Sequence, residues 1–496
     1  MSNLFDCIVI GAGPSAEPVL NRLSKTGHKT LVIHASGDSL SKSNYRHRSW
    51  FASFFGFFSL SPKQYSPGLK RADGFTRFKC LRRYSISAHN FSYTFSLGLG
   101  GLSNQWAGGA VRWSKDEILL ASGIPFAEVE SGYQSLENRL RIKAIDQTSD
   151  CALDIVSTDC DAASIYFQRP SFFLSCCDRF KTQIRADFDQ QYVWSTKSYF
   201  KALEANCSHI SFSDAFVLSM YRMNGVWHLR CLSDGLVKIF RAKSIFLCAG
   251  AISTAAILYT AYLSDGLVGQ SCQVPLWHNS TSIVPVLGPS SCLTDFSPQL
   301  PEYHWDLASD TALPLASGYF FTSQVILKSL LSSKLFSHIL PLLKPFISRI
   351  YLLTVFSGVR SAHAGVQFVA HNLDSLEVKV HSVDHPSPWQ MILRHLKHNF
   401  PRHFTLLPMA FKGQAGSDIH YACTVPFMRD NDINVAKISV FTTDKFGRAA
   451  GLDNVFVCDP SRLSFLSSKP HTFTSMALTE VSMNELMKDV GLMQFP

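Results

Sequence analysis

A glycine-rich turn near the start of the chain has the residue types and spacing to bind a phosphate group. Residues 11–16 read Gly-Ala-Gly-Pro-Ser-Ala, which is the pattern G-x-G-x-x-A. Gly11 permits a tight turn, Gly13 lets a pyrophosphate approach the backbone, and Ala16 allows a helix to pack closely on a strand. Unpaired N–H groups at the start of that helix then face the phosphates. The residues expected to line this dinucleotide site are Gly11, Gly13, Pro14, Ser15 and Ala16.

The elements that must position this turn are also visible in the sequence. Residues 5–10 form a short apolar run, and residues 30–33 form a second one. Between them, after the glycine turn, apolar residues recur at helical spacing, with Pro18 early in the pattern. This order predicts a β-α-β unit of the kind that binds dinucleotides. A β-α-β unit that is purely structural is the alternative.

The ribose position of this unit departs from the usual pattern. An acidic residue about 20 positions after the glycine turn commonly binds the ribose hydroxyls of the nucleotide. This sequence has His34 there instead. Ribose contacts are therefore expected from His34, Ser36 or Asp38, and the sequence does not distinguish among them.

A second glycine-rich segment spans residues 97–111. Five glycines among small and polar neighbours describe a backbone that lies close against something flat or bulky. A bland loop has a similar composition, but Asn104 and Trp106 among the glycines favour contact with a cofactor.

This segment resembles one that glucose-methanol-choline (GMC) oxidoreductases carry beside the isoalloxazine ring of FAD. The family's form is G-G-x-S-N-x-W-x-G, and residues 113–133 also resemble the family's passage into its substrate domain. The matching residues of the glycine segment, expected from the resemblance to bind the cofactor, are Gly100, Gly101, Ser103, Asn104, Trp106 and Gly108.

Two further segments are similar to the same family. Residues 216–245 predict a β-meander with a turn at Asn224-Gly225. The meander ends in a segment that resembles the family's Ala-Gly-Ala-Ile element, and residues 453–461 resemble its C-terminal strand and the Asp that follows. Close helix packing and a helix cap at Asp459 are the structural alternatives. The cofactor contacts that the resemblance implies in these and the following segments are Val217, Ala249, Gly250, Asp459 and Thr472.

His420 is the candidate catalytic residue, because it falls in a stretch that resembles the family's H-x-x-G-T motif. Thr424 matches the motif, Cys423 replaces its Gly, and Pro426-Phe427 replace a common Arg-Met pair. The resemblance implies that His420 takes the hydroxyl proton of the substrate. A base with a pKa near neutral suits this task, because alkoxide character develops as hydride leaves for flavin N5. His471 is the candidate for the second polar residue of the family, with a helix cap or a phosphate contact as its alternatives.

Composition excludes several other functions. The chain has 496 residues, 46 Lys and Arg against 37 Asp and Glu, and no long run of like charge, so nucleic acid binding is not expected. It has 13 cysteines without a Cys-x-x-Cys spacing, so neither a metal site nor a disulfide framework is expected. The N-terminus shows no cleavable leader, and we expect a cytoplasmic chain.

The motif positions predict a mixed α/β fold in which two domains are threaded through each other. A Rossmann-like FAD-binding domain is expected from residues 1–112, 205–275 and 412–496. A substrate-binding domain with an antiparallel sheet is expected from residues 113–204 and 276–411.

Residues 325–358 are strongly apolar but are interrupted by basic residues and prolines. A membrane-spanning helix needs about 20 residues nearly free of charge, so spanning is not expected. Buried helices of the substrate domain are one interpretation, and an amphipathic surface in peripheral contact with a membrane is the other.

The predicted function is oxidation of a CH–OH group of an alcohol or sugar-like substrate by an FAD-dependent oxidoreductase. Neither the substrate nor the electron acceptor can be identified from the sequence. One alternative is a redox-neutral flavoenzyme such as a sugar isomerase. Another is a flavin-binding or membrane-associated protein that has lost catalysis, which the departures at His34, Cys423 and Pro426 motivate.

Overall fold

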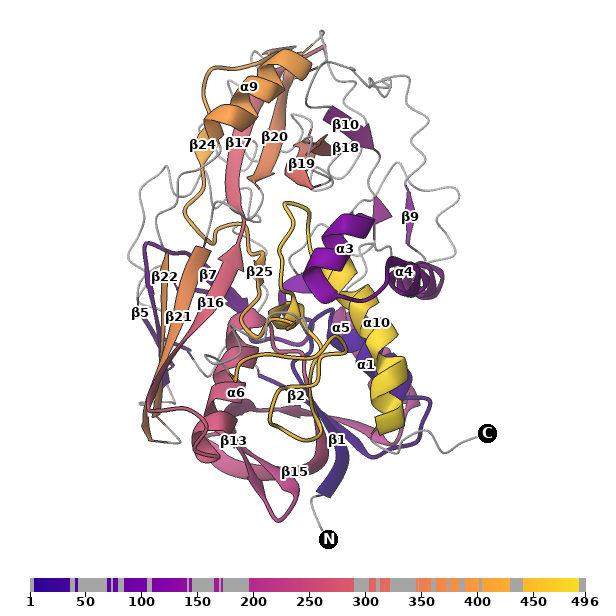
Figure 1. Cartoon of the computed structure of the whole chain (residues 1–496), viewed down its shortest axis with the longest axis vertical. Coiled ribbons are helices and arrows are strands. Elements are labelled where there is room, and N and C mark those ends of the chain that lie inside the picture. The colour runs from indigo at the N-terminus through magenta and orange to yellow at the C-terminus, as the bar shows by residue number, and fades with distance from the viewer. Residues whose placement is uncertain are drawn as a thin grey trace.

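The protein was analysed as a computed structural model, and three larger sheets with the helices packed on them organise it (Figure 1). The described residues are 4–35, 41–42, 69–72, 75–78, 84–104, 109–140, 142–144, 165–168, 171–172, 196–289, 303–308, 313–321, 345–346, 348–357, 363–372, 375–382, 389–400, 404–428 and 440–489.

The first sheet contains the predicted β-α-β unit and the predicted meander. Its strands, in spatial order, are β12 (Ile210–Asp214), β2 (Thr30–His34), β1 (Leu4–Ile10), β15 (Leu236–Leu247), β14 (Val226–Ser233) and β13 (Phe216–Met223), with β26 (Val455–Val457) beside β15. The strands β12, β2, β1, β15 and β26 pair in parallel, and β13, β14 and β15 pair antiparallel. Asn224 and Gly225 both have positive φ, which fits the tight turn predicted between the first two meander strands.

Alternate residues of β1 face two different layers, as the pleat of a strand requires. Cys7 and Val9 pack with α1 (Ala16–Leu23), α5 (Thr196–Asn206) and α10 (Thr472–Asp489). Ile8 and Ile10 pack on the opposite face with α6 (Ala251–Ser264) and the meander. Burial on both faces explains why this strand reads as an almost continuous apolar run.

The second sheet covers the other side of α6. Its strands, in order, are β25 (Tyr421–Ala422), β16 (Ser271–His278), β21 (His363–Asn372), β22 (Ser375–Ser382), β6 (Tyr84–His89), β5 (Phe75–Phe78) and β3 (Ser41–Lys42). Buried residues of β16, β21 and β22 join the same core as α6, and Tyr259 of α6 stacks on Phe368 of β21. Helix α6 is therefore enclosed between two sheets, which accounts for its almost wholly apolar sequence.

The third sheet is antiparallel and lies at the far end of the molecule, where α9 (Trp389–Asn399) covers it (Figure 1). Its strands are β10 (Ile165–Gln168), β18 (Tyr303–Ala308), β19 (Pro314–Phe321), β20 (Ile350–Ser357), β17 (Ser280–Leu287) and β23 (Thr405–Leu406), with β24 (Phe411–Lys412) also on β17. Strand β16 ends at His278 and β17 begins at Ser280, so the chain passes from the second sheet to the third at Asn279.

The remaining elements connect these layers. Helices α3 (Lys115–Ser122) and α4 (Phe126–Leu140) form a core with α10, where Gly132 lies against the backbone carbonyl of Ala477. The short elements are β4 (Leu69–Ala72) paired with β7 (Tyr93–Ser96), the small sheet of β8 (Gly109–Ala110), β11 (Ser171–Phe172) and β9 (Lys143–Ala144), and the 3-10 turns η2 (Gly101–Asn104) and η7 (Pro460–Arg462).

The architecture confirms the predicted mixed α/β fold, with a parallel core unit and a separate antiparallel sheet. The predicted domain boundaries stay a prediction. The second sheet joins strands from the predicted FAD-binding segment 1–112 to strands from the predicted substrate segment 276–411.

The apolar segment 325–358 is described only in part. Residues 350–357 form β20, an interior strand of the third sheet, rather than one of the buried helices considered from the sequence. Residues 322–344 lie outside the described residues. Among the helices that the structure describes, none is long and apolar enough to cross a membrane.

Candidate active site

The first glycine turn leaves open space where the sequence predicts a pyrophosphate. Gly11 has φ +103°, and a Cβ added there would lie 2.2 Å from the carbonyl oxygen of Cys248 at the end of β15. A Cβ added at Gly13 would instead meet no atom within 4 Å. Gly11 is therefore needed for the fold itself, whereas the space beside Gly13, at the start of α1, has room for a ligand.

The second glycine segment lies directly on the first. Gly100 donates its N–H to the carbonyl of Ala12 at 2.9 Å, and a Cβ added at Gly101 would lie 3.2 Å from Cα of Gly13. The hydroxyl of Ser103 donates to the carbonyl of Gly100 at 2.5 Å. The two segments thus form one surface of small residues. Trp106, Gly108 and the side chain of Asn104 lie outside the described residues.

Thr196, at the start of α5, holds these segments together, and the sequence reasoning missed it. Its hydroxyl lies 2.9 Å from that of Ser103 and 3.0 Å from the carbonyl of Gly100, and it is fully buried. No motif surrounds Thr196 in the sequence, so its position near the glycines could be found only from the fold.

Asp459 binds the start of α6. Its Oδ2 accepts hydrogen bonds from the Gly250 N–H at 2.8 Å and from the Thr254 hydroxyl. Its Oδ1 accepts from the N–H of Ser461 at 2.9 Å and from the hydroxyl of the same residue. Burial raises the pKa of Asp459, and these donors oppose the increase. Four donors occupy about all the acceptor positions of a carboxylate, so the side chain caps α6 and η7. Ala249 lies half-buried just before this cap.

The predicted adenosine end of the site lies where β2, β12 and β13 approach one another. His34 ends β2 opposite Asp214 of β12, and its carbonyl accepts the N–H of Ala215 at 2.7 Å. Burial lowers the pKa of His34, which favours the neutral imidazole. Val217 is half-buried near the start of β13. Ser36 and Asp38 lie outside the described residues.

The two candidate catalytic histidines, 51 positions apart in the sequence, lie side by side. The ring centroids of His420 and His471 are 5.4 Å apart, and the rings are inclined at 73°. His420 retains 17% side-chain exposure, whereas His471 is buried. Neither ring nitrogen of His471, nor Nδ1 of His420, has a hydrogen-bond partner among the described residues. The pair therefore has unused hydrogen-bonding capacity in a nearly dry location.

His471 is held as the neutral imidazole. Burial, with a smaller contribution from His420, lowers its pKa to about 3. It precedes Thr472, the half-buried first residue of α10. A neutral imidazole can donate or accept one hydrogen bond without bringing charge into the site.

The backbone around His420 is unusual on both sides. Ile419 has φ +67° and Cys423 has φ +63°, which is left-handed backbone that side chains adopt at a cost. Glycine adopts this conformation freely, so the structure shows why a Gly suits position 423 in the motif that this stretch resembles. The loop is held by Thr424, whose hydroxyl donates to the carbonyl of Ala251 at 2.7 Å, and by Tyr421, whose hydroxyl lies 2.6 Å from the carbonyl of Gly416.

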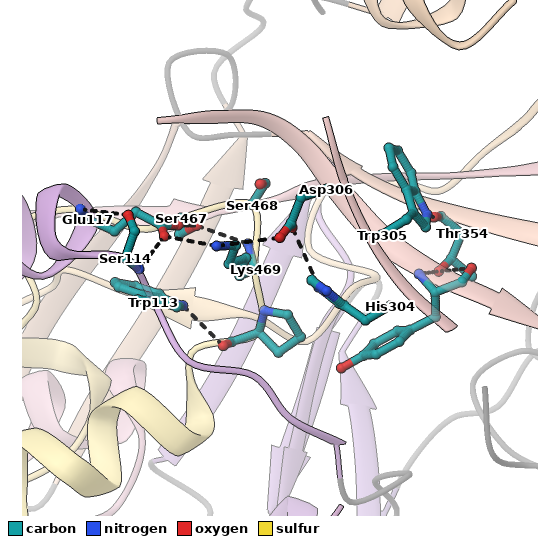
Figure 2. A network of polar contacts seen from close by, with 12 residues as sticks. Trp113, Ser114, Glu117, His304, Trp305, Asp306, Thr354, Ser467, Ser468 and Lys469 are labelled. Carbon is teal, nitrogen blue, oxygen red and sulfur yellow. Dashed lines mark hydrogen bonds and ion pairs between the residues drawn. The ribbon is translucent and has the colours of Figure 1, made fainter. Parts of the chain in front are cut away.

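A buried network of charged residues joins α3, β18 and the segment that leads to His471 (Figure 2). Lys469, two residues before His471, lies 3.1 Å from Glu117 of α3 and 3.5 Å from Asp306 of β18. Asp306 is 3.7 Å from Nε2 of His304. Burial raises the pKa of Asp306 to about 6, although Lys469 opposes the increase. The sequence reasoning missed this network because its members come from three distant segments.

Aromatic rings connect this network to the histidine pair. The ring of Tyr319 lies 5.5 Å from that of His304 and 6.2 Å from that of Phe356. Phe356 in turn lies 5.2 Å from His420. A Cβ added at Gly109 would lie 2.5 Å from the hydroxyl of Tyr319, so this ring also touches the end of the second glycine segment. Strands of the third sheet therefore form one wall beside the histidines.

Comparisons with known proteins support the fold. The structure is similar to the crystal structure of pyridoxine 4-oxidase from Mesorbium loti, with a TM-score of 0.56 over 97% of this chain and 99% of that chain. The two sequences are 14% identical, so the similarity shows a shared fold. No protein-family model matches the sequence, and no curated protein sequence matches it.

Proposed function

We propose that this chain is an FAD-dependent oxidoreductase of the GMC type that oxidises a CH–OH group of an alcohol or sugar-like substrate. The proximity of His420 and His471, whose ring centroids are 5.4 Å apart, carries the proposal. The resemblance to the family implies a pair of polar residues of this kind at the substrate. The similarity in fold to a protein named as an oxidase supports it.

The glycine surfaces fit a bound dinucleotide. The space beside Gly13 accommodates a pyrophosphate at the start of α1, and Gly100 and Gly101 extend the same surface. FAD bound there supplies the acceptor for the hydride of the substrate. Residues near His34 and Val217 would hold the adenosine end.

The histidines have different tasks in this proposal. His420, which retains some exposure, accepts the hydroxyl proton of the substrate. His471 stays neutral because of its low pKa, and it holds the substrate oxygen by one hydrogen bond. The wall of Tyr319 and Phe356 excludes water and limits the size of the group that reaches the pair.

The absorbance spectrum of the purified chain is the first test, because bound flavin gives visible bands. Anaerobic mixing with a panel of alcohols and sugars then shows whether the flavin is reduced. We expect His420→Ala to retain the flavin and to lose reduction by about 10²–10⁴-fold, the usual contribution of a general base. His398→Ala on the exposed face of α9 is the control. Undiminished reduction in His420→Ala contradicts the assignment, and flavin that returns to its oxidised form without an acceptor supports an isomerase instead.

The electron acceptor and a membrane contact through residues 325–358, outside the interior strand β20, are further proposals. Flotation with anionic vesicles tests the membrane contact, and reoxidation rates with oxygen and with artificial quinones compare the acceptors.

A further inference from the structure

A buried carboxylate, that of Asp418, lies beside His420. Oδ2 of Asp418 is 3.4 Å from Nδ1 of His420, and the Asp418 side chain has no solvent exposure. Its Oδ2 accepts the N–H of Asn279 at 3.1 Å. Oδ1 of Asp418 and Nδ1 of His420 have no hydrogen-bond partner among the described residues. Unpartnered polar atoms on two adjacent buried groups need a reason, because their desolvation is costly.

The backbone between these two residues is forced into place. Ile419, which separates them, has φ +67°, and a β-branched side chain in that region costs about 1–3 kcal/mol. The loop that contains Ile419 is held by contacts at Gly416: its N–H lies 3.3 Å from Nδ1 of His278, and its carbonyl accepts the hydroxyl of Tyr421. Strain of this kind concentrates at functional sites.

Asn279 joins the two histidine segments. Its backbone N–H donates to Asp418, and its side-chain amide donates to the carbonyls of Ser467 at 3.0 Å and Ser468 at 3.4 Å. Those carbonyls belong to the segment that leads to His471. One buried residue, at the junction between the second and third sheets, therefore sets the position of Asp418 relative to both histidines.

We propose that Asp418 is the positioning residue of the histidine pair: it accepts a hydrogen bond from Nδ1–H of His420 and leaves Nε2 as the proton acceptor. This inference rests on the proposed function. The substrate hydroxyl proton passes to Nε2, Nδ1 keeps its own proton, and Asp418 stays ionised. Bound FAD would supply the acceptor for the hydride of the substrate carbon, and the substrate would become a carbonyl compound.

The charges around His420 suit this arrangement. After proton uptake the imidazolium has the Asp418 carboxylate on one side, which stabilises it. His471, whose ring centroid lies 5.4 Å from that of His420, is neutral and does not repel it. His278 faces Asp418, and burial lowers the pKa of His278, so this neighbour is neutral as well. Among the described residues, Asp418 is thus the acidic side chain paired with His420, at 3.4 Å.

Histidine ¹⁵N NMR of the purified flavoprotein tests the proposal without any turnover. His420→Gln identifies the His420 signals by their loss. In the wild-type protein we expect the tautomer with the proton on Nδ1. In Asp418→Asn, which keeps an oxygen for the Asn279 N–H, we expect the proton affinity of His420 to fall by at least about tenfold, since a carboxylate at this distance shifts a pKa by 1–3 units. Flavin reduction should slow by about 10–100-fold, and its pH profile should move by the same amount as the NMR titration.

Asp453→Asn is the matched control, because it removes the same charge from an exposed pair with Arg222, at 2.6 Å. An unchanged tautomer and proton affinity in Asp418→Asn overturns the proposal, even if the variant is less stable or slower. If that variant does not fold, the wild-type protein still decides the matter, because a proton on Nε2 of His420 also overturns the proposal. If no alcohol reduces the flavin, the proposed function fails, yet the NMR result on Asp418 can still be read.

Discussion

The two glycines of the first turn should respond in opposite ways to the same substitution. In Gly11→Ala the new methyl group would lie 2.2 Å from the Cys248 carbonyl oxygen, in a residue with φ +103°. The backbone conformation costs about 1–3 kcal/mol, and the overlap costs about 1–3 kcal/mol more. The sum, roughly 2–6 kcal/mol, is a large part of a typical stability of about 5–15 kcal/mol.

Gly13→Ala should leave the fold intact. Its methyl group meets no atom within 4 Å, and φ at Gly13 is not in the left-handed region. Its stability should therefore stay within about 1 kcal/mol of the wild type. The methyl group occupies the space that we assign to the pyrophosphate, so flavin binding should fall sharply.

Urea unfolding and flavin content measure these two effects separately. Unfolding is followed by circular dichroism on chains stripped of flavin, because a bound ligand stabilises the folded state by itself. Flavin content is the ratio of visible to protein absorbance after reconstitution. The reasoning is refuted if Gly11→Ala unfolds at the wild-type urea concentration, or if Gly13→Ala binds flavin as the wild type does.

Three further predictions concern buried charges. Arg139 lies 2.9 Å from the fully buried Glu17 and 2.7 Å from Glu480. Arg139→Met should therefore lower the free energy of unfolding in urea by about 3–5 kcal/mol, because it leaves a buried carboxylate unpaired. Adding Glu17→Gln should restore part of the lost stability. Asp306 has a folded pKa near 6 against 3.8 in its ordinary state, so its contribution to stability is present below pH 3.8 and is lost as the pH rises to 6. The stability of the wild type relative to Asp306→Asn should therefore fall by about 3 kcal/mol across that window, and a flat difference in unfolding experiments would contradict it. Asp459→Asn should lower the stability by roughly 3 kcal/mol, because it places an amide N–H₂ against hydrogen-bond donors. A loss of flavin affinity at unchanged stability would instead identify a direct cofactor contact.

The parts of the fold that could be predicted depend on local patterns. Strand β1, the glycine turn, helix α1 and strand β2 follow one another within about thirty residues, and each has its own signature of apolar spacing or glycine. The turn at Asn224-Gly225 is equally local, since two residues with positive φ suit a tight hairpin. Residues 350–357 were harder to interpret, because an apolar run without periodicity is compatible with a buried helix or a buried strand.

The chemistry around the histidines could be predicted only in part. His420 and His471 stand in segments that resemble a known family, so their meeting could be anticipated without the structure. Asp418 and Asn279 carry no such signature, although Asp418 is only two residues from His420. Their importance depends on contacts between Asn279, at the junction of β16 and β17, and the segments before the two histidines, which lie about 140 and 190 positions further along the chain.

The structure also changes how Cys423, a departure from the family pattern, and Asp459, a match to it, are interpreted. Cys423 replaces the Gly of the motif, yet it adopts the left-handed conformation that a Gly adopts without cost. The protein tolerates this strain because Cys423 is buried and its N–H is bound to the carbonyl of Pro460 at 3.1 Å, in the turn that Asp459 caps. Asp459 also caps α6, which follows the Ala-Gly element. One buried carboxylate thus links the loop of His420 to the helix beside the proposed flavin site, so the position of the proton acceptor and the shape of the cofactor surface depend on the same contacts.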